Sequence, residues 1–207
     1  QALREGEAQE SRRRCRLPEG YILEPGDLAV KSDSRCGKLC RAAARAAIGD
    51  RPMARMRVFS MCCGAVDGMC VAAQQLGGTV VCGVEVRAER RAQWTSTFKA
   101  PCLGNATKVS DDELRSWRGK VDVLFVTAPC GDFTTAGLER HEAGETGGIY
   151  KQIYRYADMI QPHAVIFENV KGWAAGQAGD RRREDMVSNL ESRGWRCTHG
   201  LRGAHEY

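Results

Sequence analysis

The chain has 207 residues, which is enough for one domain of ordinary size with an extension. It carries 31 Lys and Arg against 26 Asp and Glu, a net charge of +5, and contains no apolar stretch long enough to cross a membrane. Residues 1–16 are charged and lack the apolar centre of a secretory signal, so we expect an intracellular protein, nuclear if its source is eukaryotic.

The excess positive charge lies at the amino-terminal end. Residues 1–57 hold 13 Lys and Arg against 8 Asp and Glu, whereas the remaining residues balance at 18 against 18. A basic arm can hold a polyanion by counterion release, and a solvated linker rich in arginine has the same composition. Prolines and glycines predict loops here, and the alanine-rich residues 41–48 predict a helix. We expect residues 1–55 to be a basic linker or the end of a preceding region.

The cysteines predict reduced thiols rather than a metal site. None of the ten is spaced as C-x-x-C, which argues against a zinc framework. Cys62, Cys70 and Cys82 fall inside or beside apolar runs, where cysteine behaves as a small hydrophobic residue. Reduced cysteines fit an intracellular protein, and no metal is expected.

From residue 56 the chain alternates between runs typical of strands and runs typical of helices. The first half predicts a strand over 57–61, a turn holding Gly64 and Gly68, a helix over 69–76, a strand over 79–86 and a helix over 88–98. A loop around Pro101 and Gly104 follows, and the acidic residues from Asp111 predict the start of another short helix.

The second half continues the same alternation. It predicts a strand from Val121, a glycine-rich loop over 131–148, a helix over 149–160, a strand ending at Phe167, a helix starting at Arg181-Arg182-Arg183, and a last strand near 195–199. The helix over 149–160 has apolar residues on one face, which predicts that this face is buried. Alternating strands and helices predict a doubly wound α/β fold, with a mostly parallel sheet and helices on both faces.

Polar side chains stand where separate predicted strands end. These positions are the turn after Phe59-Ser60, the acid Glu85, the pair Pro129-Cys130 and the pair Glu168-Asn169. Because the carboxyl ends of parallel strands meet at one edge of a sheet, we expect these residues to lie close together. Cys130 and Glu168 then suggest a cysteine nucleophile with a carboxylic acid partner.

The turn after the first strand and the acid after the second suggest a nucleoside ligand. Glu85 is placed to accept hydrogen bonds from ribose hydroxyls. The alternative is that Glu85 is an ordinary surface carboxylate. The turn lacks the G-x-G-x-x-G of pyrophosphate-binding loops. This argues against a nicotinamide oxidoreductase and fits a nucleoside cofactor without phosphates.

Together these residues resemble the cytosine-C5 DNA methyltransferases, which use S-adenosylmethionine and have a Rossmann-like fold. The resemblance spans residues 56–207. Its strongest element is Ala128-Pro129-Cys130 followed by Phe133-Thr134-Thr135-Ala136-Gly137, which is similar to the family loop Pro-Cys-Gln-x-Phe-Ser-x-Ala-Gly. The second is Phe167-Glu168-Asn169-Val170, which matches the family's Glu-Asn-Val motif. Weaker matches are Phe59-Ser60 with Gly64, Glu85, Gly104-Asn105, and the tail Gly203–Tyr207.

The resemblance implies a role for each residue at the catalytic loops. The Cys130 thiolate would add to C6 of cytosine and so activate C5 to accept a methyl group. Glu168 would hydrogen-bond the N3 edge and the exocyclic amine, and Pro129 and Asn169 would support these two residues. Because C5 lies inside the duplex stack, the nucleotide of the DNA partner would be flipped out.

The resemblance also implies a binding site for S-adenosylmethionine. Glu85 would bind the ribose, Val86 would pack against the adenine, and Asn105 would reach the adenine amine. Phe59, Ser60 and Gly64 would line the cofactor turn, and Pro129 would shape the same pocket.

Residues 56–207 are then expected to be a partial catalytic domain, without the target-recognition region. A non-enzymatic module descended from such an enzyme is an alternative, because Met61 and Cys63 stand where the family's cofactor turn has glycines. Retention of both Cys130 and Glu168 argues against it. Methylation of cytosine in RNA is another alternative, and the sequence predicts neither a target sequence nor an oligomeric state.

Overall fold

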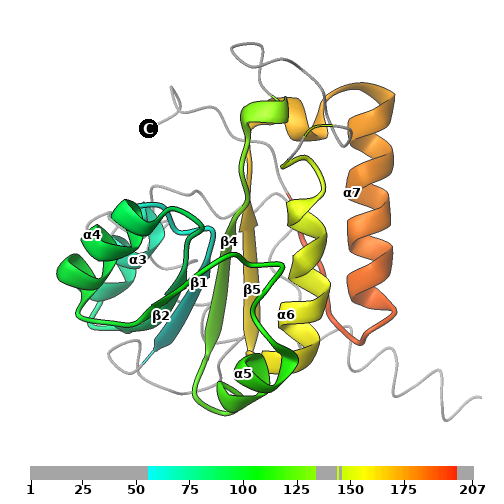
Figure 1. Cartoon of the computed structure of the whole chain (residues 1–207). Coiled ribbons are helices and arrows are strands. Elements are labelled where there is room, and N and C mark those ends of the chain that lie inside the picture. Colours follow the sequence, from blue (N-terminus) through cyan, green and yellow to red (C-terminus); the bar gives the residue numbers. More distant parts are fainter. Residues whose placement is uncertain (1–55, 134–143, 145, 200–207) are drawn as a thin grey trace, which may run out of the picture.

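The computed structural model describes residues 56–133, 144 and 146–199. Its centre is a five-stranded sheet in the order β3-β2-β1-β4-β5 (Figure 1). The strands are β1 (Arg57–Met61), β2 (Thr79–Val84), β3 (Cys102–Leu103), β4 (Val123–Thr127) and β5 (Ala164–Glu168). All four strand pairings are parallel. The predicted doubly wound α/β fold is therefore confirmed.

The strand order reverses direction between β1 and β4. From β1 the chain builds outward through β2 to β3, and it then returns to the other side of β1 with β4 and β5. At such a reversal the connections leave toward opposite faces, so a crevice opens at the carboxyl ends of the two central strands. This edge of the sheet is where the predicted site residues were expected.

Helices lie on both faces of the sheet (Figure 1). One face carries α3 (Gly68–Gln75) and α4 (Ala88–Phe98), and the other carries α5 (Asp111–Ser116), α6 (Gln152–Ile160) and α7 (Gly176–Glu191). Among the described residues, short 3-10 helices follow strands or precede helices: η3 (Gly131–Phe133), η5 (Ile149–Lys151) and η6 (Lys171–Ala174). In the described part of the chain, no helix is long and apolar enough to cross a membrane.

The sheet separates two hydrophobic cores, because successive side chains of a strand point to opposite faces. Val58 of β1 packs in the core under α3 and α4, whereas the next residue, Phe59, packs in the other core. The ring of Phe59 meets Trp117 and Tyr156 edge-on, at centroid distances of 5.7 and 6.1 Å. The opposite core is built around Trp94, which is fully buried. Both faces of β1 are thus held by aromatic packing.

Most predicted elements are present, with corrections at their ends. The second strand ends at Val84 rather than at residue 86, because the Glu85 carboxylate accepts a hydrogen bond from the backbone N–H of Arg87 and turns the chain. The helix predicted from Arg181 begins five residues earlier, at Gly176. The strand β3 falls where a loop was predicted. The helix predicted over 41–48 lies outside the described residues.

The strand predicted near residues 195–199 is wrong. These residues form no regular structure, although their alternation of side chains suits a strand. The backbone N–H of Trp195 instead donates to the carbonyl of Leu190, which closes the end of α7. A strand needs a hydrogen-bonded neighbour, and the described residues place none beside this segment.

Gly83 is expected to be needed for the packing of β2 against α4. A Cβ atom there would lie 2.4 Å from Cε2 of the fully buried Trp94. We expect Gly83→Ala to lower the free energy of unfolding by about 1–3 kcal/mol, measured by urea denaturation. Gly68→Ala is the matched control, because a Cβ at Gly68 meets no atom within 4 Å. Equal stability of the two variants would show that the Trp94 ring adapts without cost.

Candidate active site

The loops that follow β4 and β5 are tied together at the carboxyl edge of the sheet. Thr127, the last residue of β4, pairs with Glu168, the last residue of β5. Beyond this pair, Nδ2 of Asn169 donates to the backbone carbonyl of Ala128 at 3.1 Å. The Asn169 oxygen accepts from the N–H of Val170 at 2.9 Å, so its side chain is fixed at both ends. The structure thus brings the loop of Cys130 and the loop of Glu168 to the same place.

Thr127 also ties β4 to the turn after β1. Its hydroxyl lies 3.4 Å from the carbonyl oxygen of Met61 and 3.1 Å from that of Cys62, and it can donate to either. The three strands nearest the site are therefore joined through one residue. The sequence analysis did not predict this role of Thr127. The one sequence feature that indicates it is a hydroxyl residue at the end of an apolar run.

Cys130 and the following Gly131 are exposed, although the loop is buried at Ala128 before them and at Phe133 after them. Its carbonyl accepts a hydrogen bond from the N–H of Phe133 at 2.8 Å, which closes the short helix η3. Ala128 and Phe133 are 6% and 3% exposed, and Pro129 is half-buried between them and the thiol. The loop is therefore anchored on the protein while it presents the thiol to solvent.

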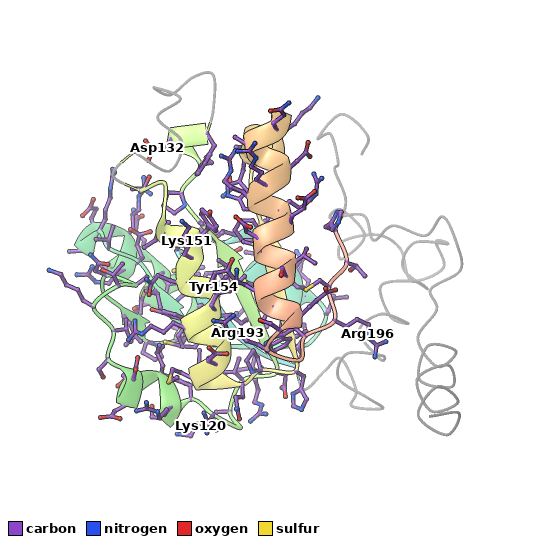
Figure 2. All side chains as sticks on the ribbon, turned by 90° about the vertical axis from the view of Figure 1, so that its right-hand side faces the viewer. Lys120, Asp132, Lys151, Tyr154, Arg193 and Arg196 are labelled. Carbon is purple, nitrogen blue, oxygen red and sulfur yellow. The ribbon has the colours of Figure 1, made fainter. Side chains whose placement is uncertain are left out.

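Asp132, inside η3, is engaged with a later part of the chain. Its Oδ2 accepts hydrogen bonds from the backbone N–H and the hydroxyl of Thr146, at 3.0 and 2.7 Å. Gly144 lies so close to this carboxylate that a Cβ there would sit 2.1 Å from its Cγ. Asp132 thus holds η3 in place, and Figure 2 shows it at the end of the molecule where η3 lies.

The surroundings of Glu168 favour the neutral form of its carboxyl group. Partial desolvation raises the pKa of Glu168 above its ordinary value, and the negative charge of Asp67 adds to this effect. A cavity of about 440 Å³ opens beside Glu168 and Asn169, between β5, η6 and α7. Cys130 is not among the described residues that line it. The carboxyl group can therefore hold a proton and donate it in a hydrogen bond at a higher pH than an ordinary glutamate.

The predicted cofactor turn is built around Glu85. One carboxylate oxygen accepts from the N–H of Gly64 at 3.1 Å, and the other accepts from the N–H of Arg87 at 2.8 Å. Gly64 has a φ of +63°, a conformation that glycine adopts without strain. Glu85 is only 7% exposed, whereas the next residue, Val86, is 62% exposed. A fixed carboxylate beside a bare apolar side chain suits a ligand with a hydroxylated part and a flat apolar part.

Two residues predicted to line this turn do not do so. Phe59 and Ser60 lie inside β1 and have no exposed area, so neither can touch a ligand. The Ser60 hydroxyl donates to Asp67, whose other oxygen accepts from the N–H of Met69 and caps α3. Ser60 supports the turn from below rather than lining it.

The predicted contact of Asn105 with an adenine amine does not fit the geometry. The Asn105 side-chain oxygen already accepts from the N–H and the hydroxyl of Thr107, both at 2.9 Å. An amide oxygen has two lone pairs, so its remaining polar group is the NH2, which donates. The adenine amine also donates, so it finds no acceptor on the Asn105 side chain.

Two thiols meet beside the turn, which the sequence did not indicate. The sulfur atoms of Cys63 and Cys102 are 3.8 Å apart, and a hydrogen bond from Cys63 lowers the pKa of the Cys102 thiol. Burial raises the pKa of Cys62 to about 12 and also raises those of Cys70 and Cys82. Cys70 and Cys82 are fully buried, which confirms that they serve as small hydrophobic residues. No cluster of three or more potential metal ligands occurs among the described residues.

Comparisons with known proteins place residues 56–207 within the model of the C-5 cytosine-specific DNA methylases. Among curated relatives, the type II methyltransferase M.AluI of Cellulosimicrobium cellulans is 28% identical over 130 residues, covering 61% of this chain and 24% of that protein. M.DsaV of Dactylococcopsis salina is 27% identical over 107 residues, covering 52% and 29%. The chain thus spans about a quarter of the length of these relatives.

A solved structure shows the same fold. It is a protein encoded within an E. coli prophage and described as a candidate DNA modification methyltransferase, with a TM-score of 0.53 and 17% identity. The match covers 66% of this chain and 38% of that chain. It supports the Rossmann-like architecture of the described residues.

We expect Glu168→Gln to stabilise the protein at neutral pH. Because folding raises the pKa of Glu168, the wild type loses stability as pH rises from the ordinary pKa of 4.5 through the raised one, since the carboxyl ionises less readily in its partly desolvated place than in the unfolded chain. Below the ordinary pKa of 4.5 the carboxyl is protonated in both states, so this difference between the variants disappears. Melting temperatures from pH 4 to 8 would show the gap opening as pH rises.

Glu184→Gln, on an exposed position of α7, controls for the loss of one negative charge from the chain. A Glu168→Gln variant that gains no more stability with pH than this control would contradict the raised pKa.

Proposed function

Because the chain belongs to the C-5 cytosine-specific DNA methylase family, we propose that it transfers a methyl group from S-adenosylmethionine to C5 of cytosine in DNA. One observation carries the proposal: the hydrogen bond from Asn169 to Ala128, which joins the loop of the exposed Cys130 to the loop that follows Glu168. A nucleophile and an acid on adjacent parallel strands can act on one ring from two sides.

Cys130 would act as the nucleophile. C5 of an aromatic cytosine is too poor a nucleophile to accept a methyl group unaided. Addition of the Cys130 thiolate to C6 forms an S–C6 bond and moves the electrons of the C5–C6 double bond toward C5. After C5 has gained the methyl group, a base removes the C5 proton, and those electrons re-form the double bond while the S–C6 bond breaks. The thiolate then leaves, so the enzyme is regenerated.

Glu168 would stabilise the ring while it carries negative charge. In its neutral form the carboxyl can donate a hydrogen bond to N3, and its carbonyl oxygen can accept one from the exocyclic amine. The raised pKa of Glu168 supports this role, because it keeps more of the group protonated near neutral pH. Donation to N3 offsets the charge that develops when the thiolate adds.

The turn after β1 would hold the cofactor. S-adenosylmethionine, when bound, supplies an electrophilic methyl group on its sulfonium. Glu85 is fixed by two backbone donors and would accept from the ribose hydroxyls, and the exposed Val86 would cover a face of the adenine. Gly64 leaves its side of the turn open, since a Cβ there would meet no atom within 4 Å. These residues fit the cofactor that the family uses.

DNA is the proposed partner, and its target nucleotide would leave the duplex stack to reach Cys130. The net positive charge of residues 1–57 suits a polyanion. The division of the chain near residue 56 and an intracellular location, nuclear if the source is eukaryotic, stay predictions.

The covalent step can be tested with an oligonucleotide duplex that contains 5-fluorocytosine. Fluorine cannot leave C5 as a cation, so the bond from Cys130 to C6 persists once C5 is methylated. We expect mass spectrometry to find one adduct with S-adenosylmethionine present, and to find none in Cys130→Ala. Cys197→Ala is the control, because this thiol is half-buried beside α7, and it should keep the adduct.

The same experiment is repeated with an RNA oligonucleotide that contains 5-fluorocytosine. An adduct with this RNA but not with the DNA duplex would redirect the proposal to RNA. The experiment is also repeated with a protein extended at its carboxyl terminus. If neither protein forms an adduct with DNA or with RNA, the chain is a non-enzymatic module.

Cofactor binding can be tested separately from turnover. We expect Glu85→Gln to weaken binding of S-adenosylmethionine about 10-fold or more by isothermal titration calorimetry, because a charge-assisted hydrogen bond is lost. Glu89→Gln is the matched control, since Glu89 is exposed in the first turn of α4. Equal affinities of the two variants would remove Glu85 from the cofactor site.

A further inference from the structure

Arg182 occupies a position where an apolar residue is expected. Four residues form the buried stripe of α7: Gly179, Arg182, Met186 and Leu190. Arg182 is only 5% exposed, and within the described part of the chain it forms no ion pair with a carboxylate. A buried charge is costly unless other groups satisfy it, so its actual contacts are informative.

Those contacts join two short helices at the candidate site. Nε and Nη2 of Arg182 both donate to the carbonyl oxygen of Trp173, in η6, at 2.9 and 2.7 Å. The guanidinium carbon lies 5.0 Å from the ring centroid of Phe133, in η3. One side chain therefore binds a backbone acceptor on one loop and an aromatic face on the other.

Each contact is close in sequence to a proposed active-site residue. The N–H of Phe133 donates to the carbonyl of Cys130, so η3 is the turn that begins at the nucleophile. The N–H of Trp173 donates to the carbonyl of Val170, two residues after Glu168, so η6 continues the other loop. Arg182 is thus placed to transmit a displacement of either loop to the other.

The base of α7 gives Arg182 little freedom to move. A Cβ atom at Gly179 would lie 2.2 Å from the backbone carbon of Ala174, so the first turns of α7 rest directly on η6. The Trp173 ring is held in turn, edge-on, by Tyr150 and Phe167, at 5.3 and 4.9 Å. With its anchor fixed, the guanidinium meets Phe133 at a set distance.

We propose that Arg182 is a positioning residue that sets the spacing between the loop of Cys130 and the loop of Glu168. The catalytic role of this spacing rests on the proposed function, whereas the structural role of Arg182 in setting the spacing does not. Asn169 ties the two loops at the sheet edge, and Arg182 ties them again from the helix layer. A lysine keeps the charge but lacks the planar fork that gives two parallel N–H groups and a flat face for the ring.

Arg193, just beyond the other end of α7, offers a matched control. Its guanidinium carbon lies 5.2 Å from the ring centroid of Tyr154, and Nε donates to Asp158 at 3.2 Å. Figure 2 shows Arg193 and Tyr154 well below Asp132, which marks η3. Arg193 therefore fastens α7 to α6 by similar contacts, away from both loops.

The first experiment measures the labelling of Cys130 by iodoacetamide, quantified by peptide mass spectrometry relative to Cys102 in the same molecule. Cys102, on β3 at the far side of the sheet, reports global loosening. We expect Arg182→Lys and Arg182→Ala to change the Cys130-to-Cys102 labelling ratio about threefold or more, because the surroundings of the exposed thiol change when η3 loses its anchor. Arg193→Ala should lower the melting temperature and leave the ratio unchanged.

The second experiment measures adduct formation with 5-fluorocytosine DNA over a range of DNA concentrations. We expect Arg182→Lys to lower the limiting rate about 10-fold with little change in the half-saturating concentration, since positioning acts on the covalent step. A labelling ratio and a limiting rate that match those of Arg193→Ala would overturn the inference and leave Arg182 a purely structural residue. If wild type forms no adduct while the labelling ratio still responds to Arg182, the proposed function fails and the positioning inference stands.

Discussion

The pairing of β4 between β1 and β5 is the constraint on which the candidate site depends. Thr127 makes this constraint specific, because it pairs with Glu168 in β5 and its hydroxyl lies within hydrogen-bond distance of the carbonyls of Met61 and Cys62 after β1. A slip of one residue in β4 would exchange its two buried faces, since Leu124 and Phe125 belong to different cores. Packing on both faces therefore fixes the register, and the register delivers the thiol, the acid and the glycine turn to one edge.

Glu85 and Glu168, the two glutamates at this edge, have different surroundings, which suggests that they have different functions. Glu85 is buried but accepts two backbone N–H bonds, so its oxygens are held as fixed acceptors. Glu168 is partly desolvated, faces the charge of Asp67, and consequently has a raised pKa. A fixed acceptor suits neutral hydroxyls that donate, whereas an acid with a raised pKa suits a ring nitrogen that gains charge. Because of their different surroundings, Glu85 suits ligand binding and Glu168 suits the chemical step, although both are glutamates.

The sequence was sufficient where local pattern decides structure. β1 and α4 match their predicted ranges, because the apolar run of β1 ends at a turn and the helical run of α4 ends shortly before Pro101. Cys130 and Glu168 could be placed at one edge for the same reason. Phe59 and Ser60 were misplaced because a motif match gives positions along a strand but not which residues lie past its end. The contacts of Thr127, of Arg182 and between Cys63 and Cys102 depend on distant partners, so no local pattern predicts them.

Arg182 shows most clearly what periodicity alone cannot reveal. It lies on the same face of α7 as the buried Met186 and Leu190, but in the sequence an arginine there reads as an interruption of that face. The structure explains it: the backbone of η6 presents a carbonyl and η3 presents an aromatic ring, and only a planar cation satisfies both. Thr127 joins β4 to the turn after β1, whereas Asn169 and Arg182 join the loop of Cys130 to the loop of Glu168 at two different places. Because the three links share no partner atoms, the loss of one leaves the other two intact, so the site should loosen by degrees instead of collapsing at once.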